Sequence, residues 1–258
     1  IEYANQTQKT EALAVLLDYK NRTADPQKEA EAQRKKQQRE MNAAENPLTE
    51  LKKLWSFRRL EDGTLEITSY KGRELHICVP EEIGGKPVRV IGQEAFSPWA
   101  RGSAEQKEHR KNIQSVILPK GLLRIEPSAF FECENLASVA IPDSVNFIGD
   151  CAFSGCKSLT SIVIPNGITS IEEFSFCDCK GLTSITIPQG VTSIDSFSFS
   201  GCQNLTDVVV PESVTAISFR AFSDSFGLFL PSKLVIHAPA GSYAETYAKE
   251  NSIPFIAE

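Results

Sequence analysis

The feature that most constrains this chain is a pattern that returns every 23 residues. Five prolines are spaced in this way: Pro119, Pro142, Pro165, Pro188 and Pro211. Apolar residues form columns at the same period, and one column reads Ile113, Leu136, Leu159, Leu182, Leu205 and Leu228. A strict period of this length indicates a solenoid, in which each copy forms one coil and stacks on the next.

Two further columns indicate what lies inside such a stack. One consists of phenylalanines: Phe130, Phe153, Phe176, Phe199 and Phe222. The other consists of cysteines, with a serine in its fifth copy: Cys133, Cys156, Cys179, Cys202 and Ser225. A single copy buries too little apolar surface to offset the conformational entropy lost on ordering, so the copies must stabilise one another through their interfaces.

Each copy divides into two extended segments and a return. The letters SITI at 184–187 have the β-branched residues typical of a short strand. Pro188 follows and ends the pairing, because proline has no N–H to donate. The letters GVTSI at 190–194 predict a second extended segment, and DSFSFSGC brings the chain back with Phe199 inside. We therefore expect a flattened coil with a strand on one side.

The full pattern is L-x-x-I-x-I-P-x-x-V-x-x-I-x-x-x-(A/S)-F-x-x-C, and one copy reads Leu159, Ile162, Ile164, Pro165, Ile168, Ile171, Phe176 and Cys179. This pattern resembles the BspA-like leucine-rich repeat family of bacterial cell-surface proteins. The resemblance is strong over 113–227 and weaker on both sides. It implies a leucine-rich repeat solenoid of the α/β repeat class, with short parallel β-strands and mostly irregular returns.

The chain divides accordingly. Residues 1–54 predict an α-helical N-terminal segment, with helices in TEALAVLLDY, in QKEAEAQRKKQQREMNAAE and in PLTELKKLW. Residues 55–258 form the expected solenoid. Its parts are a cap and first repeat at 55–96, an insertion at 97–112, regular repeats at 113–227 and a C-terminal cap at 228–258.

The charge is uneven along the chain. Residues 1–60 hold 12 Lys and Arg against 9 Asp and Glu, and the rest holds 15 against 24, which gives +3 and −9. An acidic body repels phosphate backbones, so no nucleic-acid partner is expected. No apolar run is long enough to span a membrane. The chain begins at Ile1 and no signal peptide is visible in it, so the sequence leaves export open.

The cysteines, histidines and carboxylates are the candidate reactive side chains. The four column cysteines should face inward as small hydrophobes, so we expect free thiols, with a disulfide framework as the alternative. The chain has neither a C-x-x-C pair nor an H-E-x-x-H motif, and His76, His109 and His237 are scattered, so no metal or cofactor is expected. Four carboxylates on successive coils are interpreted as a solvated acidic strip rather than a catalytic pair: Asp150, Glu172, Glu173 and Asp195. No catalytic residue is predicted.

A surface for binding is what remains. The outward residues of the first strand should line one continuous face: Ser115, Ile117, Ser138, Ala140, Ser161, Val163, Ser184, Thr186, Asp207 and Val209. In the insertion, Trp99 either packs against the coil edge in a passive excursion or contacts a partner.

These observations favour a non-enzymatic protein–protein interaction module. The family resemblance implies a bacterial cell-surface or secreted protein that adheres to a host matrix protein or a bacterial surface protein, and hence an extracellular or cell-surface location. The alternative is a structural spacer or assembly scaffold that oligomerises through the N-terminal helices.

Overall fold

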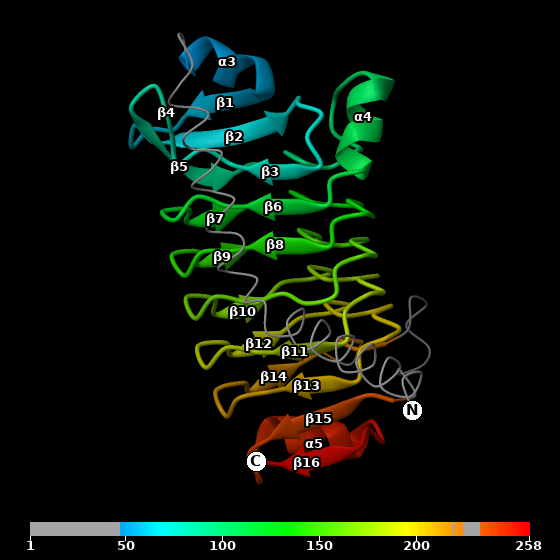
Figure 1. The fold of residues 1–258 in the computed structure, drawn as a ribbon. Coiled ribbons are helices and arrows are strands. Elements are labelled where there is room, and N and C mark those ends of the chain that lie inside the picture. The colour runs from blue at the N-terminus through cyan, green and yellow to red at the C-terminus, as the bar shows by residue number, and fades with distance from the viewer. Residues whose placement is uncertain (1–46, 219, 224–232) are drawn as a thin grey trace, which may run out of the picture. The chain divides into compact units, whose positions relative to one another are not determined.

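The computed structural model describes residues 47–218, 220–223 and 233–258. The helices expected between residues 1 and 46 lie outside this range. Residues 43–258 form one compact unit, and its described part is a stack of coils (Figure 1). The solenoid predicted from the 23-residue period is therefore what the chain forms.

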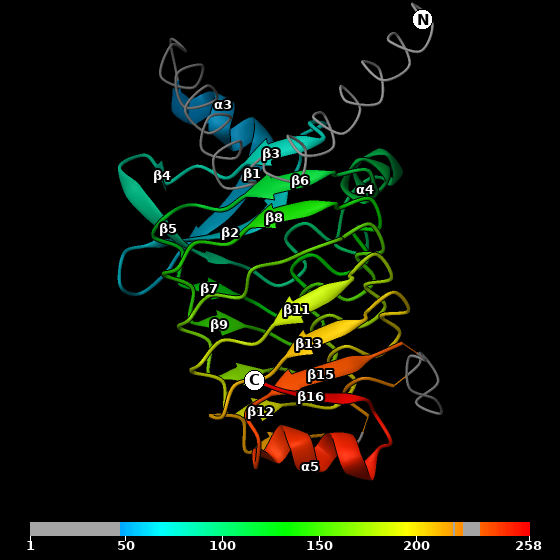
Figure 2. The ribbon, with the colours of Figure 1, turned by 60° about the horizontal axis from the view of Figure 1, so that its bottom comes forward.

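Most coils contribute a short strand to what we call the first ladder, the exception being the coil of residues 158–180, whose residues 161–163 form no strand. Three of these strands pair in parallel: β3 (His76–Cys78), β6 (Ser115–Ile117) and β8 (Ser138–Ala140). Four more pair in parallel further along: β11 (Ser184–Thr186), β13 (Asp207–Val209), β15 (Val235–Ala238) and β16 (Phe255–Ala257). They follow one another along one side of the stack (Figure 2). Partners are 23 residues apart in the regular repeats, as the sequence period requires.

The second extended segment of each coil forms a second ladder, also parallel. One group joins β5 (Lys86–Ile91), β7 (Arg124–Ile125) and β9 (Phe147–Ile148). The other joins β10 (Ser170–Ile171), β12 (Ser193–Ile194) and β14 (Ala216–Ile217). These strands are only two residues long in the regular repeats, because the isoleucine that ends each one turns into the core.

Both ends of the stack are covered. At one end lie α3 (Pro47–Leu54) and an antiparallel pair, β1 (Trp55–Arg59) and β2 (Leu65–Tyr70), while β4 (Glu82–Ile83) pairs with β5. Thus α3, which the sequence places in the N-terminal segment, belongs to the compact unit and buries Leu51. At the other end, α5 (Tyr243–Glu250) packs beside β15 and buries Tyr247.

The phenylalanine column forms the centre of the core. Phe96, Phe130, Phe153, Phe176, Phe199 and Phe222 are all at most 1% exposed. Neighbouring rings stack nearly parallel, with centroids 4.7–5.6 Å apart. Residues placed on one column by the sequence thus meet face to face along the stack, which confirms that this column faces inward.

The return segments make a third side, which we call the turn side, and it has its own hydrogen bonds between coils. The Phe130 amide donates to the Ala152 carbonyl at 2.8 Å, and the Phe153 amide donates to Ser175 at the same distance. One turn position on this side has a positive φ in four coils, at Glu132, Gly155, Asp178 and Gly201. Glycine occurs there twice because it adopts that conformation without steric cost.

Candidate interaction surface

The outward positions of the first ladder form the predicted binding surface, which we call the strand face. The structure leaves most of them accessible. Six are exposed: Ser138, Ser161, Val163, Ser184, Thr186 and Asp207. Three are half-buried: Ser115, Ala140 and Val209. Val163 is 65% exposed, an unusual value for a large apolar side chain, and lies near the middle of the face.

Ile117 does not belong to this accessible set, which corrects the sequence-based interpretation. Its side chain is 7% exposed. In the ladder it lies between Cys78 and Ala140, its register partners on the neighbouring strands. A residue flanked on both sides in this way loses most of its accessible area. Alternation along the strand predicts only which face a side chain is on, not how far its neighbours cover it.

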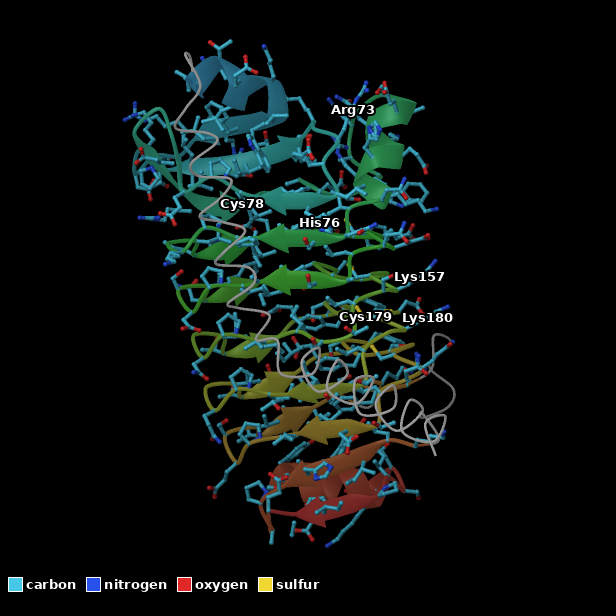
Figure 3. All side chains as sticks on the ribbon, in the orientation of Figure 1. Arg73, His76, Cys78, Lys157, Cys179 and Lys180 are labelled. Carbon is cyan, nitrogen blue, oxygen red and sulfur yellow. The ribbon has the colours of Figure 1, made fainter. Side chains whose placement is uncertain are left out.

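Two histidines lie towards the two ends of the strand face, and the sequence analysis missed both. His76 on β3 pairs in register with Ser115, and its Nδ1 lies 2.9 Å from the Ser115 Oγ (Figure 3). His237 on β15 pairs in register with Val209. The signal was present, because Pro80 and Pro239 follow the strands of these coils as Pro119 and Pro211 follow theirs.

The end of the face near β13 carries charge. The Asp207 carboxylate accepts a hydrogen bond from Thr206 Oγ1 at 2.6 Å, and its Oδ1 lies 3.1 Å from His237 Nε2. The bond from Thr206, followed by the one from His237, lowers the pKa of Asp207 below its usual range. The face thus has a neutral middle of serine, threonine and valine, and an anionic group at one end.

Trp99, in the insertion, is presented to solvent. Its side chain is 65% exposed, so the prediction that it packs passively against the coil edge is wrong. The indole is nevertheless fixed, because its Nε1–H donates to Glu132 Oε2 at 2.8 Å. Its backbone amide also donates to Ser97 Oγ at 3.1 Å. The side chain is therefore both exposed and oriented.

The insertion that carries Trp99 is anchored by an arginine. Helix α4 (Ala104–Lys111) begins with a capping box between Ser103 and Gln106. Near its end Arg110 is 1% exposed and donates to the Tyr70 carbonyl at 3.0 Å and to Ser69 Oγ at 2.7 Å. Burial lowers the pKa of the Arg110 guanidinium. At the surface, Arg73 (labelled in Figure 3), in the segment before β3, forms an ion pair at 2.5 Å with Glu105 of the insertion.

The acidic strip is less solvated than the sequence suggests. Asp150 and Glu173 are exposed, but Glu172 and Asp195 are half-buried. Burial, followed by the charges of Asp195 and Asp150, raises the pKa of Glu172.

A recess of about 350 Å³ lies beside the acidic strip, lined by Glu173, Ile194, Asp195, Ser196, Ala216, Ile217 and Ser218. The hydroxyls of Ser196 and Ser218 lie 2.8 Å apart and hydrogen bond to each other. The recess therefore offers two carboxylates and a pair of hydroxyls already engaged with one another.

The described ranges also show whether metal ligands, reactive thiols or a membrane-spanning helix are present in them. They contain no group of three or more His, Cys, Asp and Glu residues arranged to hold a metal ion. None of the seven cysteines, all of which lie in these ranges, forms a disulfide bond, and the four in the column are fully buried, as predicted for that column. Burial raises the pKa of each column thiol, so these groups remain protonated at neutral pH. Among the same residues no helix is both long and apolar enough to cross a bilayer.

Comparisons with solved structures agree with this geometry. A leucine-rich repeat protein of T. pallidum is 21% identical, with a TM-score of 0.57 over 80% of this chain and 98% of that one. A leucine-rich repeat protein of Bacteroides ovatus is 29% identical over 71% of this chain, with a TM-score of 0.55. The pneumococcal vaccine antigen PcpA is 18% identical over 79% of this chain, also with a TM-score of 0.55. This chain covers 48% of the length of each of the last two.

Comparison with curated proteins gave no match. The family model for the BspA type leucine rich repeat region matches six copies across residues 108–228. Those limits include all the regular coils and the end of the insertion. Residues 108–228 therefore match the BspA type of leucine-rich repeat, and the stack of coils has the leucine-rich repeat fold.

Proposed function

We propose that this protein is a non-enzymatic protein–protein interaction module, displayed on a bacterial cell surface or secreted, that adheres to a partner protein through its solenoid surface. The observation that carries the proposal is the accessible strand face. Leucine-rich repeat proteins generally serve as interaction modules, and stacked coils present long continuous surfaces suited to that role. The cell-surface location follows from the family's association with bacterial surface proteins.

The chemistry of the face indicates what it accepts. Ser161, Val163 and Ser184 are all exposed, and Ser161 and Ser184 occupy the same position in successive repeats. Together they form a neutral, weakly apolar strip. A protein surface or extended segment with small polar and aliphatic side chains can cover this strip without desolvating a charge. A host matrix protein or a bacterial surface protein is the class of partner we favour.

Trp99 supplies a second contact. Tryptophan is enriched among the residues that contribute most to binding, provided that it lies in a well-packed contact. The hydrogen bond to Glu132 and the anchor at Arg110 fix the indole before any partner arrives, which reduces the entropy lost on binding.

Binding to immobilised extracellular matrix proteins and bacterial surface proteins, measured by surface plasmon resonance, tests the proposal. Ser161→Arg and Ser184→Arg place bulky charges on the strand face, and each should weaken binding by about tenfold or more. Trp99→Ala should weaken it by a similar factor. Thr169→Arg is the matched control, because Thr169 is exposed beside the second ladder and its substitution should leave affinity unchanged.

Two results would contradict the proposal. One is the absence of binding across the whole panel. The other is equal affinity for the wild type and both strand-face variants. The spacer alternative involves residues outside the described range, and a concentration-dependent oligomer of the full chain in sedimentation velocity, without any partner binding, would support it instead.

A further inference from the structure

We infer that the solenoid bends at a joint between the coil of residues 135–157 and the coil of residues 158–180. Both ladders are interrupted at this junction. The first ladder stops at β8 and resumes at β11, and the second stops at β9 and resumes at β10 (Figure 1). The junctions at β6–β8 and at β11–β13 keep both ladders, and the next junction after the joint keeps the second ladder through β10 and β12, so the loss of both ladders is not a property of the repeat.

Backbone hydrogen bonds show the interruption in the first ladder. In intact coils the amide before the column proline donates to the next coil, as Leu118 does to Ala140 at 3.2 Å and Ile187 to Val209 at 2.9 Å. The counterpart at the joint is Ile141, and Ile164 is the counterpart at the next junction, between coil 158–180 and coil 181–203. Neither amide has a main-chain acceptor within the described residues.

The second ladder shows the same loss. The Gly149 amide donates to the Ile125 carbonyl, and the Asp195 amide donates to Ile171, both at 2.9 Å. Glu172 is the equivalent residue between them, and across the described ranges its amide has no backbone acceptor. Two independent faces of the coil have therefore lost their bonds at one junction.

Packing is also looser on the open side. Ile141 and Pro142 are half-buried, whereas Leu118 and Pro119 one coil earlier are buried. Within the phenylalanine column, the widest ring spacing is 5.6 Å between Phe153 and Phe176. These differences follow directly if the coils diverge where the ladder bonds are missing.

The turn side remains closed and acts as the pivot. Here the Cys179 thiol donates to the Phe153 carbonyl at 3.2 Å, as Cys156 and Cys202 do to their own phenylalanine carbonyls. The Gly155 amide donates to Cys177 at 2.7 Å across the same junction. The two coils are thus held by hydrogen bonds on the turn side and lack them at both ladders. They can therefore move apart most easily by opening at the ladders about the turn side.

The joint gives the strand face an adjustable curvature. Opening separates Ser161 and Val163 from β8, in the middle of the face. A partner that fits one curvature better would shift the population towards it, by no more than its difference in affinity for the two forms. This property belongs to the scaffold itself and stands whether or not the proposed partner class is right.

Amide hydrogen exchange of the intact protein tests the joint. After correction for intrinsic rates, Ile141 and Glu172 should exchange at least about tenfold faster than Leu118, Ile187 and Asp195. Equal exchange in the two groups overturns the proposal. The rate of thiol alkylation under the same conditions reports on the pivot. Cys179 should be protected from alkylation to the same degree as Cys202. If Cys179 is alkylated at the rate at which the junction amides exchange, the coil unfolds rather than bends, and the proposal fails.

Cysteine pairs test the motion itself. Ser138→Cys with Ser161→Cys spans the joint, and Ser184→Cys with Asp207→Cys spans intact register partners, all four sites being exposed. Parallel neighbours held in register have poor disulfide geometry. The pair across the joint should therefore oxidise about tenfold faster, because it samples other geometries. Equal rates for the two pairs contradict a bending joint.

Discussion

The thiol of Cys156 donates a hydrogen bond to the backbone carbonyl of Phe130, one coil earlier, at 3.3 Å. The same bond recurs between Cys133 and Phe96, and between Cys179 and Phe153. Cysteine therefore has two roles in this column. It fills a small apolar space, and it gives a buried carbonyl a second donor, which valine or alanine could not supply.

Cys156→Ala should lower the free energy of unfolding by about 1–3 kcal/mol, because the buried Phe130 carbonyl keeps only the Cys133 amide of its two donors and a small cavity remains. Urea denaturation followed by circular dichroism measures the change. Cys177→Ala is the control, since Cys177 is only half-buried, and its effect should be clearly smaller. Equal losses in the two variants would mean that the thiol hydrogen bond contributes nothing.

Ser175→Ala and Ser198→Ala should each stabilise the protein by about 1 kcal/mol. The hydroxyls of both serines are buried without a hydrogen-bond partner. Alanine already occupies the same column at Ala129, Ala152 and Ala221, so the smaller side chain fits the coil. Thermal and urea denaturation would show the gain.

Ser223→Ala is the control for these two substitutions, because the Ser223 hydroxyl does have a hydrogen-bond partner. Its hydroxyl is buried and donates to the Arg220 carbonyl at 3.0 Å. Its loss should destabilise the fold by about 0.5–1.5 kcal/mol. If Ser175→Ala and Ser198→Ala destabilise as much as Ser223→Ala, their hydroxyls have partners after all.

Stability should fall steeply at alkaline pH. Burial raises the pKa of Cys177 from 9.0 to about 11, and it raises the pKa of the column thiols further. The folded protein therefore holds protons that the unfolded chain releases above pH 9, so this stability is present below pH 9 and is lost as the pH rises. Each fully buried thiol should contribute a slope of about 1.4 kcal/mol per pH unit.

Urea denaturation under reducing conditions at pH 7, 9 and 10 measures this dependence. The free energy of unfolding should change little between pH 7 and 8 on account of thiols and then decline. Cys156→Ala removes one of the four column thiols. Above pH 9 it should reduce the slope of the unfolding free energy against pH by the contribution of one proton, about 1.4 kcal/mol per pH unit. A flat profile up to pH 10 would show that the thiols ionise in the folded state.

Arg110→Ala should release the insertion from the stack. The substitution leaves the Tyr70 carbonyl without its donor and empties the space of a large buried side chain. We expect a loss of about 2–4 kcal/mol and faster amide exchange across 101–112. Lys107→Ala, at an exposed site on the same helix, should have little effect on either measure. Unchanged exchange in Arg110→Ala would contradict the anchoring role.

Much of the fold follows from the period alone. Because Phe153 and Phe176 are 23 residues apart and hold the same place in the repeated pattern, they occupy equivalent positions in adjacent coils, and the structure stacks their rings at 5.6 Å. The strand before each proline and the inward cysteine follow by the same reasoning. Identical copies can stack in one regular way only if equivalent residues meet, so the repeat in the sequence becomes a repeat in space.

The site depended on contacts that the pattern does not contain. Alternation marked Ile117 as outward, but its neighbours in the ladder bury it. Histidines that are far apart in the sequence, His76 and His237, lie on one face because two irregular coils join the same ladder. For Trp99 the sequence left two alternatives open, and only the structure shows that it is 65% exposed while its indole hydrogen bonds to Glu132.

The sequence by itself thus determined which residues recur, which of them are buried and that a solenoid results, since a strict period admits one kind of stacking. Tertiary structure alone decided where that stacking is interrupted, how the insertion is anchored and which outward residues stay accessible. Those outcomes depend on distances between coils and on single side chains such as Arg110, which a local pattern does not encode.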